Sequence, residues 1–334
     1  MVTKPTAPAP AIDTKRVIEL ASGFLTSLSS HVFDILTVSK PVSPDAALNL
    51  AKVVSKLSPL LGNLIEFNTV EFLNKKEEFA PFGKWRRQDP GFPDTVFDGA
   101  ISPAPGFEIK AWFPLATEIT GRFKDSQNRF AENNIYVCMP AWLPEHLIYG
   151  RPYLLDVVVV SGLSVAKARD EHYHNPPAYL VVEPEDTTAR TANLQQTNTS
   201  GYVWQGEPKQ FEEAAKIVEG WGKDGNQYNP TREYQKHVRD LMNRYSYRLD
   251  TNYAKMDRVE HDGIEAFKTK VCNTVVNGMT VKEWSRLFAS IKPSVEQKLK
   301  LTTPQLWAQR EAKVRAALEK HLQIKGEDPE KLLV

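Results

Sequence analysis

The sequence predicts an α/β protein in which a mixed β-sheet is flanked by helices and followed by a mostly helical C-terminal region. Three observations predict this class. Short β-rich runs, separated by proline and glycine, alternate with helical stretches through the middle of the chain. From Pro208 onward, apolar residues follow the helical period almost throughout. The 334 residues are 41% hydrophobic and 25% charged, a composition typical of a globular protein with a sizeable core.

The first part of the chain is expected to be helical after a short tail. Residues 1–12 contain several prolines without periodicity, which predicts a flexible tail. Ser43, Pro44 and Asp45 supply a capping hydroxyl, a first-turn proline and an acid near the positive end of the helix dipole. The expected helices cover about 13–38, 43–57 and 60–76.

The strands of the predicted sheet are short apolar runs between turn signals. They are expected at about 95–101, 107–113, 135–139, 153–160 and 179–182, with helices at about 117–132 and 163–172. The C-terminal helices are expected at about 211–219, 232–249, 281–291 and 304–322. Their apolar sides, which include Trp284, Leu287, Phe288 and Trp307, are expected to pack on the core or on a second subunit.

Composition excludes several classes of protein. The longest apolar run, residues 154–160, is far shorter than a membrane span and contains Asp156, so no membrane association is expected. The N-terminal residues lack the apolar core of a signal peptide, which predicts a cytoplasmic protein. Cys138 and Cys272 are too few for a disulfide framework or a cysteine-rich zinc site. The net charge of +1 argues against binding nucleic acid by charge alone, so any contact with DNA requires a shaped site.

Two acids and a lysine are expected to meet at one edge of the sheet. Asp94 opens one apolar run, residues 102–106 have strong turn chemistry, and a second run carries Glu108, Ile109 and Lys110. Because side chains alternate along a strand, Glu108 and Lys110 share a face while Ile109 points into the core. Pairing of the two runs can therefore bring Asp94 beside Glu108.

This grouping suits hydrolysis of a phosphodiester. Carboxylates are the oxygen ligands that Mg²⁺ prefers, and the metal neutralises developing charge and polarises a water molecule. A lysine beside them can orient that water or hold the phosphate. An ordinary hairpin with a surface Glu–Lys pair would have the same sequence pattern. Asp98, four residues after Asp94 and on the same strand face, is an alternative first carboxylate or an accessory acid.

At these residues the sequence resembles the PD-(D/E)XK nuclease superfamily, and particularly the type II restriction endonucleases. Pro93-Asp94, thirteen further residues and Glu108-Ile109-Lys110 match the motif. The resemblance implies a restriction-endonuclease-like sheet within a nuclease core at 13–230, with a helical region at 231–334. It also implies catalysis by Asp94, Glu108 and Lys110. In that scheme Mg²⁺ is held by Asp94, Glu108 and the backbone carbonyl of Ile109.

Family members often carry a glutamate on a helix before the motif. Glu66 occupies that region and is a possible accessory residue, although a solvated acid on a helix face has the same appearance. The implied function is cleavage of double-stranded DNA at a short specific sequence, leaving 5′-phosphate and 3′-hydroxyl ends. A homodimer is expected, because two scissile phosphates call for two active sites. The alternatives are another PD-(D/E)XK nuclease, for repair or for a DNA structure, and a non-catalytic DNA-binding or scaffold protein.

Two further segments are candidates for contact with DNA. The basic cluster at 84–87 precedes the motif and can reach a phosphate backbone, or can be a strand with solvated charges. The long polar stretch at 183–206 is rich in side chains that read bases. The DNA-binding candidates are Lys84, Arg86, Arg87, Arg190, Asn193, Gln195, Gln196 and Asn198. His172, His174 and Asn175 suggest a histidine–metal nuclease less well than a helix end followed by a proline turn.

Overall fold

The computed structural model describes the chain at residues 12–88, 91–115, 127–174, 180–182, 202–205, 208–223, 225, 229, 231–244, 248–249, 261–291 and 304–324. Its helices are α1 (Thr14–Thr26), α2 (Pro44–Val53), α3 (Ser58–Asn74), α4 (Gly162–His174), α5 (Pro208–Glu219), α6 (Arg232–Arg244), α8 (Asp262–Asn273), α9 (Val281–Ala289) and α11 (Pro304–Leu322). The short 3₁₀ helices η1 (Val54–Leu57) and η2 (Gln127–Phe130) lie between them.

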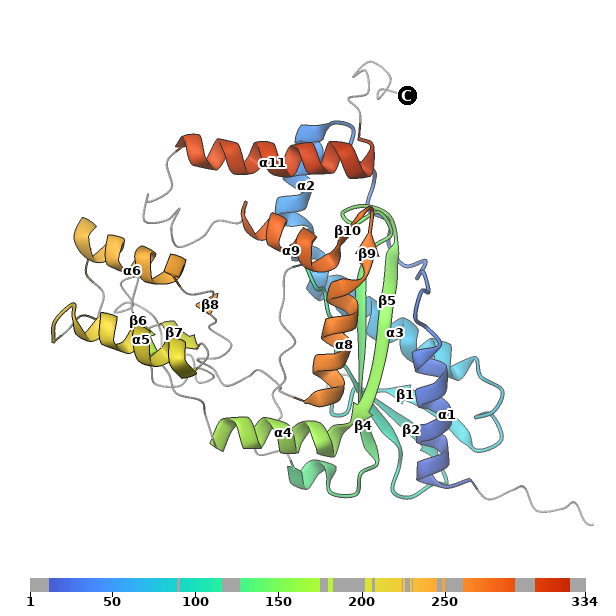
Figure 1. Cartoon of the computed structure of the whole chain (residues 1–334). Coiled ribbons are helices and arrows are strands. Elements are labelled where there is room, and N and C mark those ends of the chain that lie inside the picture. The colour runs from blue at the N-terminus through green and yellow to red at the C-terminus, as the bar shows by residue number, and fades with distance from the viewer. Residues whose placement is uncertain are drawn as a thin grey trace, which may run out of the picture.

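A mixed five-stranded sheet forms the centre of the molecule (Figure 1). Its strands are β1 (Gly83–Arg87), β2 (Thr95–Gly99), β3 (Gly106–Ile109), β4 (Ile135–Pro144) and β5 (Pro152–Ser161). They lie in the order β1-β2-β3-β4-β5, with β3 and β4 parallel and every other neighbouring pair antiparallel. This sheet and the helices around it confirm the predicted mixed α/β class with a helical C-terminal region.

Helices cover both faces of the sheet (Figure 1). In the picture α1 and α3 lie on one side, and α4 and α8 lie on the other. α3 packs along β1, while α1 and α8 both pack against β5. One continuous hydrophobic cluster runs through these layers and includes Val17 of α1, Phe107 of β3, Trp142 of β4 and Ile264 of α8. At β5 the sheet is therefore held between helices on both faces, as in layered α/β folds.

α1 ends twelve residues earlier than the predicted 13–38. The Ser27 hydroxyl donates to the Phe24 carbonyl, and Ser30 adopts a left-handed conformation with φ of 68°. These local contacts compete with the helical hydrogen bonds. The next residues pair with the free edge of β5, where the Phe33 amide donates to the Pro152 carbonyl at 2.9 Å. The periodic pattern of this segment was correct for α1, but edge pairing with β5 overrides it after Thr26.

The outer edge of β1 is closed by a side chain from α3. Asn74 donates to the Trp85 carbonyl at 2.9 Å and accepts from the Trp85 amide at 2.8 Å. β1 was expected only as one of two interpretations of the basic cluster, because its sequence is mostly charged. Trp85 itself is buried against Phe79, Phe97 and Phe107. The hydrogen bonds from Asn74 and this aromatic packing explain why a segment with exposed Lys84 and Arg86 forms a strand.

The C-terminal helices divide between two hydrophobic clusters. Trp284 and Phe288 of α9 are buried in the main cluster, and Leu287 and Trp307 pack partly buried against it, as predicted. α5 and α6 share a separate cluster, formed by Ala214, Val218, Tyr234, Val238 and Leu241. A three-stranded antiparallel sheet in the order β6 (Leu180–Val182), β7 (Tyr202–Gln205) and β8 (Arg248–Leu249) accompanies them, and β9 (Val275–Val276) pairs with β10 (Met279–Thr280). The expected boundary at residue 230 falls between α5 and α6.

Several expectations fall wholly or partly outside the described residues. Residues 1–11 of the predicted tail and 117–126 of the helix predicted at 117–132 are among them. The described end of that segment is η2, a single 3₁₀ turn. Among the described residues, no helix is both long enough and apolar enough to cross a membrane.

Candidate functional site

Antiparallel pairing of β2 with β3 brings Asp94 beside Glu108. Thr95 lies opposite Phe107 in this pair, so the residue before Thr95 meets the residue after Phe107. The Asp94 amide donates to Oε2 of Glu108 at 3.3 Å, and the Ile109 amide donates to Oδ2 of Asp94 at 2.6 Å. The two carboxylates therefore lie side by side, as the spacing predicts.

Lys110 completes the cluster from the same face of the chain. Its ammonium group forms an ion pair with Oε1 of Glu108 and lies 4.0 Å from Oδ2 of Asp94. The Lys110 amide donates to the Cys138 carbonyl of β4 at 2.8 Å, so the parallel β3–β4 pairing fixes the backbone at this point. The ammonium group thus lies between two carboxylates and balances part of their charge.

The two acids are withdrawn from solvent while the lysine is not. The exposed fractions of the side chains are 10% for Glu108, 18% for Asp94 and 37% for Lys110. Burial, together with repulsion from Glu108, raises the pKa of Asp94 from 3.8 to about 6, against the lowering effect of Lys110. A carboxylate that is this costly to ionise is a feature common at functional sites.

Glu66 reaches the same neighbourhood from α3. Nε of Arg87 on β1 donates to Oε1 of Glu66 at 2.8 Å, and only 14% of the Glu66 side chain is exposed. Burial is the main cause that raises the pKa of Glu66; the hydrogen bond from Arg87 lowers it, and the charge of Asp94 raises it. The structure therefore places the predicted helix glutamate within electrostatic range of Asp94.

Asp98 and two of the basic residues lie away from this cluster. Nε of Arg86 is 3.6 Å from Oδ2 of Asp98, and both side chains are more than half exposed. Lys84 lies opposite Asp98 in the β1–β2 pair. At about 3.3 Å per strand residue, Asp98 lies some 13 Å along the strand from Asp94. The contacts with Glu108 and Lys110 are made by Asp94.

The alternation of side chains gives the two faces of the sheet different characters. Trp85 and Phe97 face the cluster beneath α3, so Lys84, Arg86 and Asp98 lie on the opposite face. By the same alternation through the β2–β3 register, Glu108 also belongs to that opposite face. Lys84, Arg86 and the carboxylate cluster of Asp94, Glu108 and Lys110 thus lie on a common side of the sheet, whereas Arg87 lies on the side of α3.

One positioning residue was not predicted from the sequence. Gln88 donates from its side chain to the Pro93 carbonyl at 2.9 Å, and its amide donates to the Asp94 carbonyl at 2.7 Å. These two bonds fix the backbone on both sides of the first carboxylate. The only signal in the sequence is that Gln88 follows the basic cluster directly, which does not distinguish it from other polar residues.

Other predicted residues cannot be placed. Arg190, Asn193, Gln195, Gln196 and Asn198 lie outside the described residues, as does Asn175. The backbone of His172 and His174 belongs to α4.

The residues at the cluster fit a magnesium ion. Within the described ranges, no three His, Cys, Asp or Glu side chains come close enough to hold a metal ion by themselves. Mg²⁺ needs fewer protein ligands, because it keeps several waters and binds through one or two carboxylates plus substrate phosphate. Asp94 and Glu108 offer such oxygens, and burial followed by repulsion from Glu108 raises the pKa of Asp94 in spite of Lys110. A divalent cation would relieve that repulsion.

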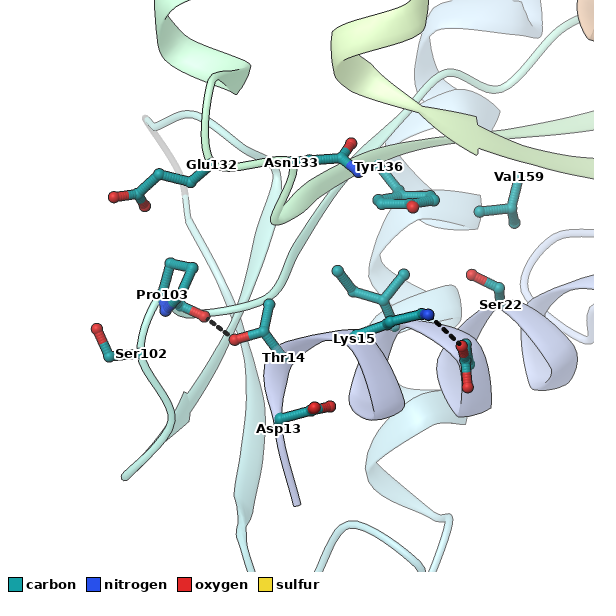
Figure 2. A pocket seen from close by; sticks show the side chains of 12 residues that line it. Asp13, Thr14, Lys15, Ser22, Ser102, Pro103, Glu132, Asn133, Tyr136 and Val159 are labelled. Atoms are coloured by element: carbon teal, nitrogen blue, oxygen red, sulfur yellow. Dashed lines mark hydrogen bonds and ion pairs between the residues drawn. The ribbon is translucent and has the colours of Figure 1, made fainter. Parts of the chain in front are cut away.

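A separate groove lies on the face of the sheet opposite Glu108 and Lys110 (Figure 2). It has a volume of about 750 Å³ and is bounded by the first turns of α1, the β2–β3 turn and the start of β4. At its edge the Thr14 hydroxyl donates to the Pro103 carbonyl at 2.5 Å, and Lys15 pairs with Glu19 at 4.0 Å. Asp94, Glu108 and Lys110 do not line this groove.

Comparisons with protein-family models, with curated proteins and with solved structures find no match to this chain. The functional argument therefore rests on the geometry of the cluster.

Proposed function

We propose that the protein is a Mg²⁺-dependent PD-(D/E)XK nuclease, and specifically a cytoplasmic type II restriction endonuclease that cuts double-stranded DNA at a short sequence. The observation that carries the proposal is the convergence of Asp94, Glu108 and Lys110 at the junction of β2 and β3. The order and direction of the strands support a restriction-endonuclease-like sheet, since the motif then lies on an antiparallel pair next to a parallel one.

Each member of the cluster has a distinct task. Asp94 and Glu108, with the backbone carbonyl of Ile109, would hold Mg²⁺ at the scissile phosphate. When bound, the ion would supply positive charge that stabilises the transition state and promotes ionisation of the attacking water. Lys110 would hold the phosphate or orient the water, since 37% of its side chain is exposed beside the two carboxylates. Gln88 keeps Asp94 in place, and Arg87 holds the accessory acid Glu66.

The DNA would approach the face of the sheet that carries Lys84 and Arg86. Both residues lie on the exposed side of β1, which is the side of Glu108. Arg86 shares its guanidinium with Asp98, so a phosphate would compete with a solvent-exposed ion pair that is worth little. Phosphate contacts of this kind position a duplex without reading its sequence. The expected products carry 5′-phosphate and 3′-hydroxyl ends.

Plasmid digestion tests the proposal directly. Purified protein is incubated with supercoiled plasmids of known sequence in Mg²⁺, with EDTA as the control. Discrete, reproducible fragments are the expected result, and end sequencing of them gives the recognition site. Smearing, or cutting only at flaps and mismatches, would favour another PD-(D/E)XK nuclease. DNA binding without cleavage in Mg²⁺ would favour a non-catalytic scaffold.

A further inference from the structure

The groove between α1 and the sheet has the size of a ligand site (Figure 2). Its volume of about 750 Å³ lies within the range of small-molecule sites. One end is at Thr14, whose hydroxyl is bonded to the β2–β3 turn, and the other is at Ser22. The eight residues between these two positions correspond to about 12 Å along α1. The groove is therefore elongated and suits a linear ligand.

The middle of the groove is apolar. Ile18 of α1, Tyr136 of β4 and Val159 of β5 line it, together with Pro103 at one end. In Figure 2 the ring of Tyr136 lies across the groove from α1. An aliphatic chain can pack between these side chains, and the face of an aromatic ring also attracts an ammonium group. The lining thus favours methylene groups that carry positive charge.

Carboxylates stand on both walls of the groove. Glu132, in the loop before β4, is exposed and forms no ion pair with any described residue. Glu19, on α1, pairs with Lys15 at 4.0 Å and with Arg16 at 3.5 Å. Both pairs are exposed and therefore worth little, so the ammonium group of a ligand can replace Lys15. Asp13, the third acid of the lining, caps α1 and offsets the positive end of its dipole.

The spacing of these acids decides the shape of the cation. Asp13, Glu19 and Glu132 do not converge on one point, because no three acidic, histidine or cysteine side chains of the described residues come close enough to hold a metal ion. Glu19 and Glu132 instead line the groove from different elements, with apolar side chains between them. A ligand that pairs with both must carry separate positive charges joined by an apolar chain.

A polar atom at one end of the groove has no partner. The hydroxyl oxygen of Ser22 is buried and makes no hydrogen bond within the described part of the chain. In Figure 2 the Ser22 side chain points from α1 toward the groove. A buried hydroxyl without a partner costs free energy, and an ammonium group bound beside it can donate the missing hydrogen bond. This atom indicates, independently of the carboxylates, that the ligand carries a donor.

We propose that the groove binds an aliphatic polyamine. One ammonium group pairs with Glu132, and a second lies between Glu19 and Ser22, which are neighbours three residues apart on α1. The methylene chain packs between Ile18 and Tyr136. Because both carboxylates are exposed and few ligand atoms are buried, we expect a dissociation constant of about 10–100 μM. The groove lies on the face of the sheet opposite the carboxylate cluster, so the proposal does not depend on DNA cleavage.

Titration calorimetry of the full chain with spermidine, in EDTA and without DNA, tests the proposal. The wild-type protein should bind one spermidine. Glu132→Gln should raise the dissociation constant about tenfold or more, because it removes the partner of one ammonium group. Glu77→Gln, at an exposed acid after α3, is the matched control and should leave it unchanged. Lys15→Gln should lower the dissociation constant about threefold, because Glu19 then has one competing cation fewer.

A series of ligands tests the need for separate charges. n-Butylamine should bind at least about tenfold more weakly than spermidine, and about 5 mM Mg²⁺ should not displace spermidine, because neither cation can span the groove. Spermidine should also raise the melting temperature of the wild-type protein more than that of Glu132→Gln.

Three results would overturn the proposal: no saturable binding below about 1 mM, equal weakening by Glu132→Gln and Glu77→Gln, or displacement of spermidine by Mg²⁺. Tighter binding of the tripeptide Lys-Ala-Lys than of spermidine would do the same, because it would identify a basic peptide as the partner. DNA cleavage plays no part in these readouts, so failure of the nuclease proposal would leave them intact, and the reverse also holds.

Discussion

Replacing Asp94 by asparagine should make the folded protein more stable at alkaline pH. The pKa of Asp94 rises from 3.8 to about 6 on folding, which corresponds to a cost of about 3 kcal/mol for folding with this group ionised. That cost is complete above pH 6. It falls as the pH drops from 6 to 3.8, because the folded state then binds a proton that the unfolded state does not, and it is absent below pH 3.8, where both states are protonated. Asparagine resembles the protonated form and can still accept from the Ile109 amide.

The expected gain is no larger than this cost, which already includes the attraction between Asp94 and Lys110. We expect the free energy of unfolding in EDTA to rise by about 1–3 kcal/mol at pH 8. For a chain of 334 residues this is a rise in melting temperature of about 1–4 °C. The difference should shrink toward zero at pH 4. Asp98→Asn, an exposed control, should change stability by less than about 0.5 kcal/mol.

Urea unfolding at pH 8 and pH 4 measures the expected gain in stability at pH 8 and its expected loss at pH 4. Addition of Mg²⁺ at ten times its dissociation constant should stabilise the wild-type protein by about 1.4 kcal/mol at pH 8 and should not stabilise Asp94→Asn. A variant less stable than wild type at pH 8, or a difference that does not vary with pH, would refute the claim that burial and repulsion strain this carboxylate.

Four further changes test the scaffold of the protein. Gly23→Ala should raise the free energy of unfolding by about 0.5–1 kcal/mol, since an added Cβ meets nothing within 4 Å on an exposed helix. Gly106→Ala should lower it by about 1–3 kcal/mol and slow any cleavage, because its Cβ would lie 2.6 Å from the proline ring that precedes Asp94; equal stability of the two alanine variants in urea would contradict this. Asn74→Ala should cost about 1–2 kcal/mol by uncapping the edge of β1, with faster hydrogen exchange there as the readout. Deletion of 280–334 should abolish cooperative unfolding by circular dichroism, since it removes α9 and α11 from the main cluster, and a well-folded truncation would show the region to be dispensable.

The hairpin at the site could be predicted because its signals are local. Turn residues between two apolar runs fix which residues can pair, and alternation then places Asp94 beside Glu108. The ion pair between Arg87 and Glu66 could not be predicted in the same way. It depends on how α3 packs along β1, and their separation of 21 residues gives no register for that contact. The sequence suggested only that Glu66 belongs near the motif.

The predicted end of the first helix was wrong for a related reason. Its apolar periodicity continues past Thr26, but the backbone of residues 30–38 finds partners at the edge of β5. β1 illustrates the opposite case, because its charges conceal a strand that Trp85 and Asn74 stabilise from one face and one edge. Local propensity yields to tertiary contacts in both places.

Single-turnover cleavage by four variants in Mg²⁺ tests the central claim most directly. Asp94→Asn, Glu108→Gln and Lys110→Ala should each slow cleavage of a cognate duplex by several orders of magnitude, on the order of 10³-fold or more. Each should still give a specific gel shift, because affinity arises mainly from phosphate and base contacts elsewhere. Asp98→Asn should cut at close to the wild-type rate. Near-normal cleavage by the Glu108 and Lys110 variants would contradict the account, whereas a dead Asp98→Asn with an active Asp94→Asn would move the first carboxylate to Asp98.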